Sequence, residues 1–162
     1  MKSIKPIGIM ISKKTKYGLQ ALLALARAYG EGPVLIADLS EEERIPKKFL
    51  EAILLQLKNV GILSSRKGKG GGYALGKPPG EISIGQIVRI LDGPLAPVEC
   101  VSVTAYRPCT ECRDESTCGI RLVMKDVRDA IADILDHTSL ADMQKRSEAA
   151  AHQQKSVVDF QI

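Results

Sequence analysis

The sequence of 162 residues contains no tryptophan, and aromatic residues make up only 4% of it. No apolar run approaches the ~20 residues that a membrane-spanning helix needs, so we expect no membrane association. The apolar stretch near the start is short and is interrupted by Pro6, which argues against a signal peptide. With 44% hydrophobic and 26% charged residues, the composition is that of an ordinary soluble protein, and the length predicts one domain, or a small domain with an appendage. Without an export signal, we expect a cytoplasmic location.

Histidine is also scarce. The two copies, His137 and His152, lie near the C-terminal end and are interpreted as exposed surface residues. No nucleophile–base pair is evident, so we do not expect an enzyme. The glycine-rich stretch GKGGGYAL does not lead into a helix, as a Walker loop requires, and Tyr73 stands where the dinucleotide fingerprint needs its last glycine. Nucleotide binding is therefore disfavoured.

Acidic residues are few in the first half of the chain. Residues 1–79 hold 14 Lys and Arg against 6 Asp and Glu, a net charge of +8, whereas residues 80–162 hold 9 against 13, a net charge of −4. A basic half on an otherwise ordinary protein indicates an anionic polymer as partner. The alternative is a basic face that is merely solvated.

Hydrophobic periodicity and breaker residues predict three helical segments, a hairpin, a short helix and one long helix. These elements are expected at 12–29, 35–43, 46–60, 62–75, 83–93 and 119–136. The third segment should bury Phe49, Leu50, Ile53, Leu54 and Leu57. The long helix carries a single apolar stripe of Ile120, Val123, Met124, Val127, Ile131, Ile134 and Leu135. A short capped turn is expected at 138–143, and residues 144–162 read as a flexible tail.

This order predicts a mainly α fold with a small β-hairpin wing, that is, a winged helix–turn–helix followed by a long helix. The third segment is then the natural reader of the major groove. Lys47 and Lys48 lie in its first turn, where positive charge opposes the helix macrodipole at a cost of ~0.5 kcal/mol each. That placement favours phosphate binding, although two tolerated surface lysines would look the same. The hairpin tip carries Arg66, Lys67 and Lys69 among glycines, which suits a minor groove or a DNA backbone.

All four cysteines fall between residues 100 and 118, in the pattern C-x8-C-x2-C-x5-C. A disulfide, metal-free thiol sensing, zinc and an iron–sulfur cluster all remain open. Zinc ribbons usually present two close pairs, whereas Cys100 and Cys118 are singletons. An iron–sulfur cluster tolerates irregular spacing when the thiolates converge, and we favour it for that reason.

The stretches ISKKTKYGLQALLALA, FLEAILLQLKNVGILSSRKGKGGGYAL and SIGQIVRILDG, followed by the cysteines and a long helix, resemble the Rrf-type winged-helix transcriptional regulators. The likeness covers roughly residues 10–143 and leaves residues 1–9 as an N-terminal extension. It implies a homodimer whose long helices cross-pack on a double-stranded DNA operator. The residues at the family's DNA-contacting positions are Ser12, Lys14, Tyr17, Lys47, Lys48, Glu51, Ala52 and Lys67. The resemblance implies that Glu51 discriminates between target sequences and that Lys67 enters the minor groove. Packing is the alternative role for Tyr17 and Tyr73.

Cluster-binding members of that family use three cysteines, the last two separated by five residues. Cys112 and Cys118 fit this spacing, Cys100 fits the first ligand if the loop is longer, and Cys109 is an additional candidate for a fourth ligand. The positions of the two known fourth ligands hold Arg121 and Lys16, so the resemblance leaves [2Fe–2S] and [4Fe–4S] open.

The resulting map has a DNA-binding domain, a connecting helix and loop, a cysteine-rich sensor loop, a dimerisation helix and a tail. These parts are expected at 10–80, 81–98, 99–118, 119–143 and 144–162. We predict a regulator, most simply a repressor, whose operator affinity is controlled by a cluster that moves the two wings relative to half-sites ~34 Å apart. One alternative is a metal-free Rrf-type repressor that responds to thiol oxidation or a protein partner. Another is a redox or metal-handling protein whose basic half merely adheres to nucleic acid.

Overall fold

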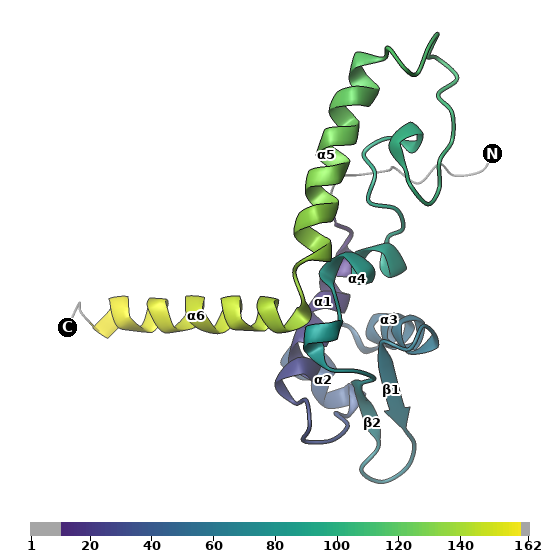
Figure 1. Ribbon diagram of the computed structural model, residues 1–162. Coiled ribbons are helices and arrows are strands. Elements are labelled where there is room, and N and C mark those ends of the chain that lie inside the picture. Colours follow the sequence, from purple (N-terminus) through teal and green to yellow (C-terminus); the bar gives the residue numbers. More distant parts are fainter. Residues whose placement is uncertain (1–10, 160–162) are drawn as a thin grey trace.

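The computed structural model describes residues 11–159, with side chains through residue 154, and confirms the expected fold class (Figure 1). The predicted N-terminal extension lies outside the described residues. Helices and strands follow in the order expected from the sequence, with two short 3-10 turns between them. Their bounds are α1 Lys13–Arg27, α2 Ile36–Glu42, α3 Lys47–Asn59, β1 Leu63–Arg66, β2 Gly72–Leu75, η1 Pro79–Glu81, α4 Ile84–Leu91, η2 Glu99–Val101, α5 Gly119–Asp136 and α6 Leu140–Asp159.

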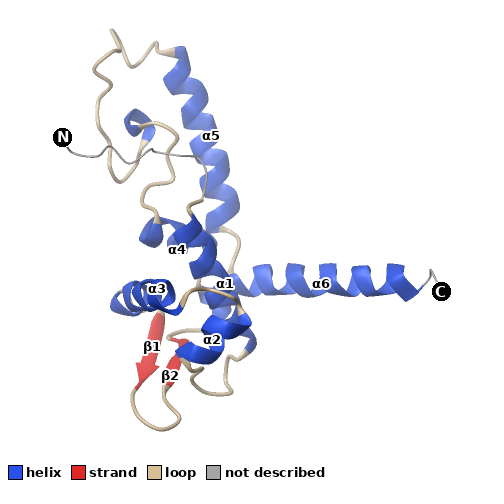
Figure 2. Ribbon diagram, turned by 180° about the vertical axis from the view of Figure 1, so that it is seen from behind, coloured by secondary structure: helices blue, strands red, loops and turns tan. Residues whose placement is uncertain are grey.

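Local signals explain where the elements begin and end. The Ser12 hydroxyl accepts a hydrogen bond from the Thr15 backbone N–H and so caps α1. Gly61 follows α3 with a φ of 78°, which a residue without a Cβ adopts freely. Strands β1 and β2 form an antiparallel hairpin in which Leu63 faces Leu75 and Arg66 faces Gly72 (Figure 2).

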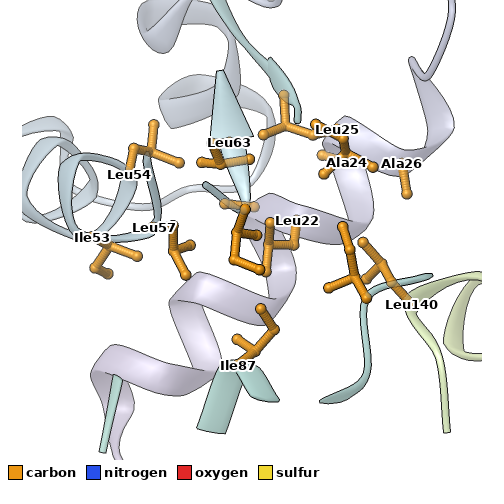
Figure 3. Close-up of a cluster of buried hydrophobic side chains, with 14 of the residues drawn as sticks. Leu22, Ala24, Leu25, Ala26, Ile53, Leu54, Leu57, Leu63, Ile87 and Leu140 are labelled. Atoms are coloured by element: carbon orange, nitrogen blue, oxygen red, sulfur yellow. The ribbon is translucent and has the colours of Figure 1, made fainter. Parts of the chain in front are cut away.

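The core surrounds α1 (Figure 3). Leu22 of α1 is fully buried and lies among side chains from α3, β1, α4 and the start of α6. Prediction and structure differ at Phe49, which is 47% exposed, because the buried face of α3 runs along Leu50, Ile53, Leu54 and Leu57. Phe49 precedes that stripe by one residue, about 100° around the helix.

Helix α5 rises from this core and buries none of its own residues (Figure 1). Its predicted apolar stripe is exposed in part. Ile120, Val123 and Ile134 are 71%, 57% and 62% accessible, whereas Met124, Val127, Ile131 and Leu135 are half-buried. A stripe of this size on a folded chain calls for a partner. At its base, α5 is tied to α4 by Arg89, whose two terminal nitrogens donate to the Asp136 carboxylate at 2.5 and 2.8 Å.

Residues 144–159, which the sequence pattern assigned to a flexible tail, are helical, because α6 continues to Asp159 and projects away from the body (Figure 1). The expected cap is present, since Ser139 and Asp142 exchange side-chain-to-backbone hydrogen bonds at 3.0 and 3.1 Å. Leu140 is fully buried in the core and anchors the helix. Among residues 11–159, no helix is long and apolar enough to cross a membrane.

Candidate DNA interface and cysteine loop

The first turns of α3 present two lysines to solvent. Lys47 and Lys48 are exposed, as are Glu51 and Ala52. Within the described part of the chain, neither lysine takes part in an ion pair. Uncompensated cations at a helix N-terminus are poorly placed for the folded chain alone, so they favour an anion as partner.

The hairpin lies beside α3 and ends in a basic tip (Figures 1 and 2). Arg66, Lys67 and Lys69 are all exposed there. Strand β2 is anchored next to this tip by Val34, which exchanges two backbone hydrogen bonds with Tyr73, each 2.8 Å long. Tyr73 is half-buried against the core. This anchor restricts how far the basic tip can move relative to the body of the chain.

The start of α1 is engaged within the chain. Ser12 donates through its backbone N–H to the Asp92 carboxylate at 2.9 Å, and its hydroxyl donates to the same group. Burial opposes ionisation of Asp92, but these bonds from Ser12 hold its pKa below the ordinary value. The Lys14 ammonium donates to Gln56 Oε1 at 2.6 Å and to the Leu91 carbonyl at 3.2 Å. Ser12 and Lys14 therefore already have partners, and a DNA contact by either would compete with them.

Tyr17 packs against the outward-facing Phe49. The two rings meet edge to face with centroids 5.9 Å apart, and the Lys13 ammonium lies 5.5 Å from the Tyr17 ring centroid. Packing is thus an observed role for Tyr17.

The cysteine loop lies against the upper half of α5, at the far end of the molecule from the wing (Figures 1 and 2). The Cys112 thiol donates to the Asp114 carbonyl at 3.8 Å. Cys118 lies close enough to interact with this thiol, and the interaction raises the pKa of Cys112 to about 11. Cys118 is the N-cap residue of α5, where the Arg121 backbone N–H lowers its pKa, and the interaction with Cys112 adds to the effect. The two thiols are therefore unequal, with Cys118 the more readily ionised.

The remaining cysteines flank this pair. Cys100, in η2, and Cys109, which is exposed, add weaker electrostatic contributions to the raised pKa of Cys112. All four cysteines are free thiols. Among the residues the structure describes, no three His, Cys, Asp or Glu side chains form a ready metal site. A cluster would need Cys100 or Cys109 to move toward the pair, and residues 102–117 contain no helix or strand to resist such a movement.

Glu115 holds the loop together. Its carboxylate accepts hydrogen bonds from the Tyr106 hydroxyl at 2.8 Å and the Cys109 backbone N–H at 3.2 Å, and it lies 3.7 Å from Arg121 Nε. The bond to Glu115 raises the pKa of Tyr106. Arg121 also donates to the Cys100 carbonyl at 3.3 Å. Sequence reasoning missed Glu115, because nothing in its neighbourhood distinguishes it from any other surface carboxylate.

A second missed residue is Gln56, which links α3 to α4. Its amide nitrogen donates to the Ile90 carbonyl at 2.6 Å, while its oxygen accepts from Lys14. Helix α4 is in turn tied to the base of α5 by the Arg89–Asp136 pair. Contacts therefore run from the cysteine loop along α5 and α4 to the recognition helix.

Both histidines lie on the surface, as the sequence predicts. His137 is exposed, with its Nδ1 3.1 Å from the Asp133 carboxylate, and His152 is exposed on α6.

Comparison with known proteins gives a consistent result. Residues 11–146 match the Rrf2 family, described as "Iron-dependent Transcriptional regulator". A putative HTH-type transcriptional regulator, rrf2-like, from Rhodobacter capsulatus is 42% identical over 145 residues, covering 88% of this chain and 97% of the relative. The structure of CymR, the global cysteine regulator of B. subtilis, superimposes with a TM-score of 0.71 at 32% identity over 85% of this chain and 97% of that one. The structure of T. potens IscR superimposes with a TM-score of 0.68 at 30% identity, covering 90% of this chain and 93% of that one. These relatives are transcriptional regulators and not enzymes.

Proposed function

Because the chain belongs to the Rrf2 family of transcriptional regulators, we propose that it binds a double-stranded DNA operator as a homodimer and that its cysteine loop controls this binding by holding an iron–sulfur cluster. We infer a cytoplasmic location, where thiols stay reduced. Membership of the family establishes transcription regulation and DNA binding by a winged helix. The operator contacts, the dimer and the cluster are the proposed part.

The observation that carries the DNA interface is the set of uncompensated cations on one end of the molecule. Lys47 and Lys48 begin the recognition helix, and Arg66, Lys67 and Lys69 cover the wing tip beside it. The DNA backbone could therefore bind to α3 and to the wing at the same time. Glu51 and Ala52, exposed one turn further along α3, are then placed to meet base edges, where a carboxylate accepts from cytosine N4 and repels phosphate.

The homodimer is supported by α5. Within residues 11–159, the side chains of Ile120, Val123 and Ile134 on its apolar stripe remain exposed, and burial against a second copy would remove them from water. A two-fold arrangement of wings and recognition helices follows, as a pseudo-palindromic operator requires.

The cluster would be held by Cys100, Cys112 and Cys118, with Cys109 as the candidate fourth ligand. Four thiols within one irregular loop are a suitable donor set, and two of them, Cys112 and Cys118, already lie close enough to shift each other's pKa. When bound, the cluster supplies a group whose charge changes with its redox state. A change in the loop would pass to the rest of the chain through two sets of contacts. Arg121 and Glu115 link the loop to α5, and Arg89 links α5 to α4.

A metal-free thiol switch is the second candidate, and the interaction of Cys112 with Cys118, which makes the two thiols unequal in pKa, favours it. A peroxide could oxidise the more readily ionised Cys118 to a sulfenic acid with release of water, and the Cys112 thiol would then displace a second water to form a disulfide. The similarity to CymR, a cysteine regulator, supports this candidate as well as the similarity to IscR supports the first.

The test begins with protein purified without oxygen, its visible spectrum, and its iron and sulfide content. The operator is selected from randomised duplex DNA, and affinity is measured at several salt concentrations before and after cluster loss. We expect a coloured, iron-containing protein whose operator affinity changes on cluster loss. Cys112→Ser and Cys118→Ser should abolish iron binding, and Cys109→Ser reports on the fourth ligand.

A colourless, iron-free protein would contradict the cluster. If its operator affinity then changes with peroxide and recovers with a thiol reductant, and a Cys112–Cys118 disulfide appears by mass spectrometry, the metal-free switch is supported. Binding to all duplexes alike, lost entirely at moderate salt, would refute operator recognition itself.

A further inference from the structure

The turn between α2 and α3 contains an unusual residue. Arg44 has a φ of 53°, in the left-handed region that a residue with a Cβ adopts only at a cost. Every other residue with positive φ in the described part of the chain is a glycine. Arg44 is thus the exception among the described residues, because a side chain stands where the chain otherwise places glycine.

The local hydrogen bonds explain why this backbone must be left-handed. The Arg44 N–H donates to the Glu41 carbonyl at 3.3 Å, and the Ile45 N–H donates to the Ser40 carbonyl at 3.0 Å. This pair of bonds is the Schellman motif that ends a helix, and its left-handed position is ordinarily glycine. Ile45, only 1% exposed, fixes the motif in the core. Glycine would serve the turn at no conformational cost, so the fold alone gives no reason for arginine.

The side chain of Arg44 is not used within the chain. It is exposed, and it forms no ion pair or side-chain hydrogen bond with any other described residue. The acidic residue beside it, Glu43, is paired with Arg27 at 3.4 Å. A cation near the end of α2 gains a little from the helix dipole, but α2 has only seven residues, and the same gain is open to neighbouring positions without left-handed backbone.

We propose that Arg44 binds a phosphate of the operator backbone next to the recognition helix. This inference rests on the proposed function. In a helix–turn–helix, the first helix crosses the DNA backbone and the second enters the major groove by its N-terminal end, so the turn between them lies beside phosphates. Arg44 precedes α3 by three residues and continues the run of free cations formed by Lys47 and Lys48. A guanidinium can hold a phosphate through two parallel hydrogen bonds, which lysine cannot do.

The experiment separates the needs of the fold from those of DNA binding. We compare Arg44→Gly, Arg44→Asn and Arg44→Lys with the unmodified protein, measuring the thermal unfolding midpoint and the affinity for the selected operator against salt. Arg44→Gly should raise the midpoint by a few degrees, because glycine relieves the left-handed strain. It should weaken operator binding by roughly eight-fold per subunit at about 0.1 M salt and reduce the salt slope by about 0.9 per subunit.

Asparagine tolerates the left-handed region and carries no charge, so Arg44→Asn should lose the same affinity and slope. Arg44→Lys keeps the charge and should retain most of the salt slope while losing part of the affinity. Lys145→Ala, which removes one exposed cation from α6, is the matched control and should leave both quantities unchanged.

Wild-type affinity and salt slope in Arg44→Gly would overturn the inference, provided that the unmodified protein binds its operator and Lys67→Ala weakens that binding. The proposed function would then stand without Arg44. If Lys145→Ala reduced the salt slope as much as Arg44→Gly does, the inference would also be overturned, because the loss of slope would then follow from the net charge of the protein and not from a phosphate contact of Arg44. If the unmodified protein selects no operator, the proposed function fails and the inference fails with it.

Discussion

The wing is held at a set distance from the recognition helix by a glycine. Gly72 has a φ of 145°, and a Cβ at this position would overlap the Val34 carbonyl oxygen and lie 3.0 Å from the Leu35 nitrogen. Both obstacles are backbone atoms, which cannot rotate away. In Gly72→Ala, the hairpin must therefore separate from Val34, and the two 2.8 Å hydrogen bonds between Val34 and Tyr73 must break or lengthen.

The expected loss of stability follows from these contacts. Two backbone hydrogen bonds contribute about 1 kcal/mol each, and the unfavourable φ adds about 1 kcal/mol. The total of about 3 kcal/mol corresponds to a fall of roughly 6–12 °C in the thermal unfolding midpoint of a chain of this size. Operator affinity should also fall, because Arg66, Lys67 and Lys69 would be displaced from the phosphates that α3 engages.

Gly70 supplies the matched control within the same hairpin. Its φ is 76°, but a Cβ there meets nothing within 4 Å. Gly70→Ala should therefore lose only about 1 kcal/mol, or roughly 2–4 °C, and retain most of its operator affinity. Thermal unfolding followed by far-UV circular dichroism, with affinity measured on the same samples, checks both variants. Equal effects of the two substitutions would refute the argument that the contact with Val34 positions the wing.

Three further predictions concern α4, α5 and α6. Leu140→Ala should cost about 2–5 kcal/mol in urea unfolding, because Leu140 is fully buried, whereas the exposed Lys145→Ala should stay within about 0.5 kcal/mol of wild type. Asp136→Asn should cost about 0.5–1 kcal/mol at neutral pH, because the bond from Arg89 holds the pKa of Asp136 below its ordinary value and the pair is partly exposed. Since that contribution is present above the unfolded pKa of about 3.9 and is lost as pH falls through the lower folded pKa, the difference between variant and wild type should vanish in acid; an unchanged difference there would contradict the assignment. Val123→Glu should shift the protein from dimer to monomer in sedimentation at micromolar concentration, and a persistent dimer would place the interface elsewhere.

Sequence reasoning succeeded where a short stretch of chain determines its own structure. The expected elements rest on breaker residues, the capped turn at 138–143 and the glycines of the wing. The structure shows that such signals act within a few residues, as Ser12, Ser139 and Gly61 do at helix ends. The amphipathic pattern of the long helix predicted α5 for the same reason. The positions of the exposed cations on α3 and the wing follow directly from these elements, so most of the candidate DNA interface could be predicted.

The tertiary structure decided which side chains remain available. Lys14 looks like a free cation in the sequence, but Gln56 and the Leu91 carbonyl, far along the chain, engage its ammonium. Phe49 lies on the outside because α3 packs through a face one residue removed from it. Residues beyond 143 have no apolar periodicity, yet one buried leucine at the start of α6 docks the helix on the core.

The cysteine loop shows the same division. The spacing of its four cysteines suggested a shared site, but only the fold brings Cys112 close to Cys118 at the start of α5 and gathers Tyr106, Cys109 and Arg121 around Glu115. Helix caps, turns and amphipathic periodicity can be predicted from the sequence, because the interactions that determine them act between residues within one or two turns of chain. Contacts between distant segments depend on how completed helices pack, and no short stretch of sequence carries that information.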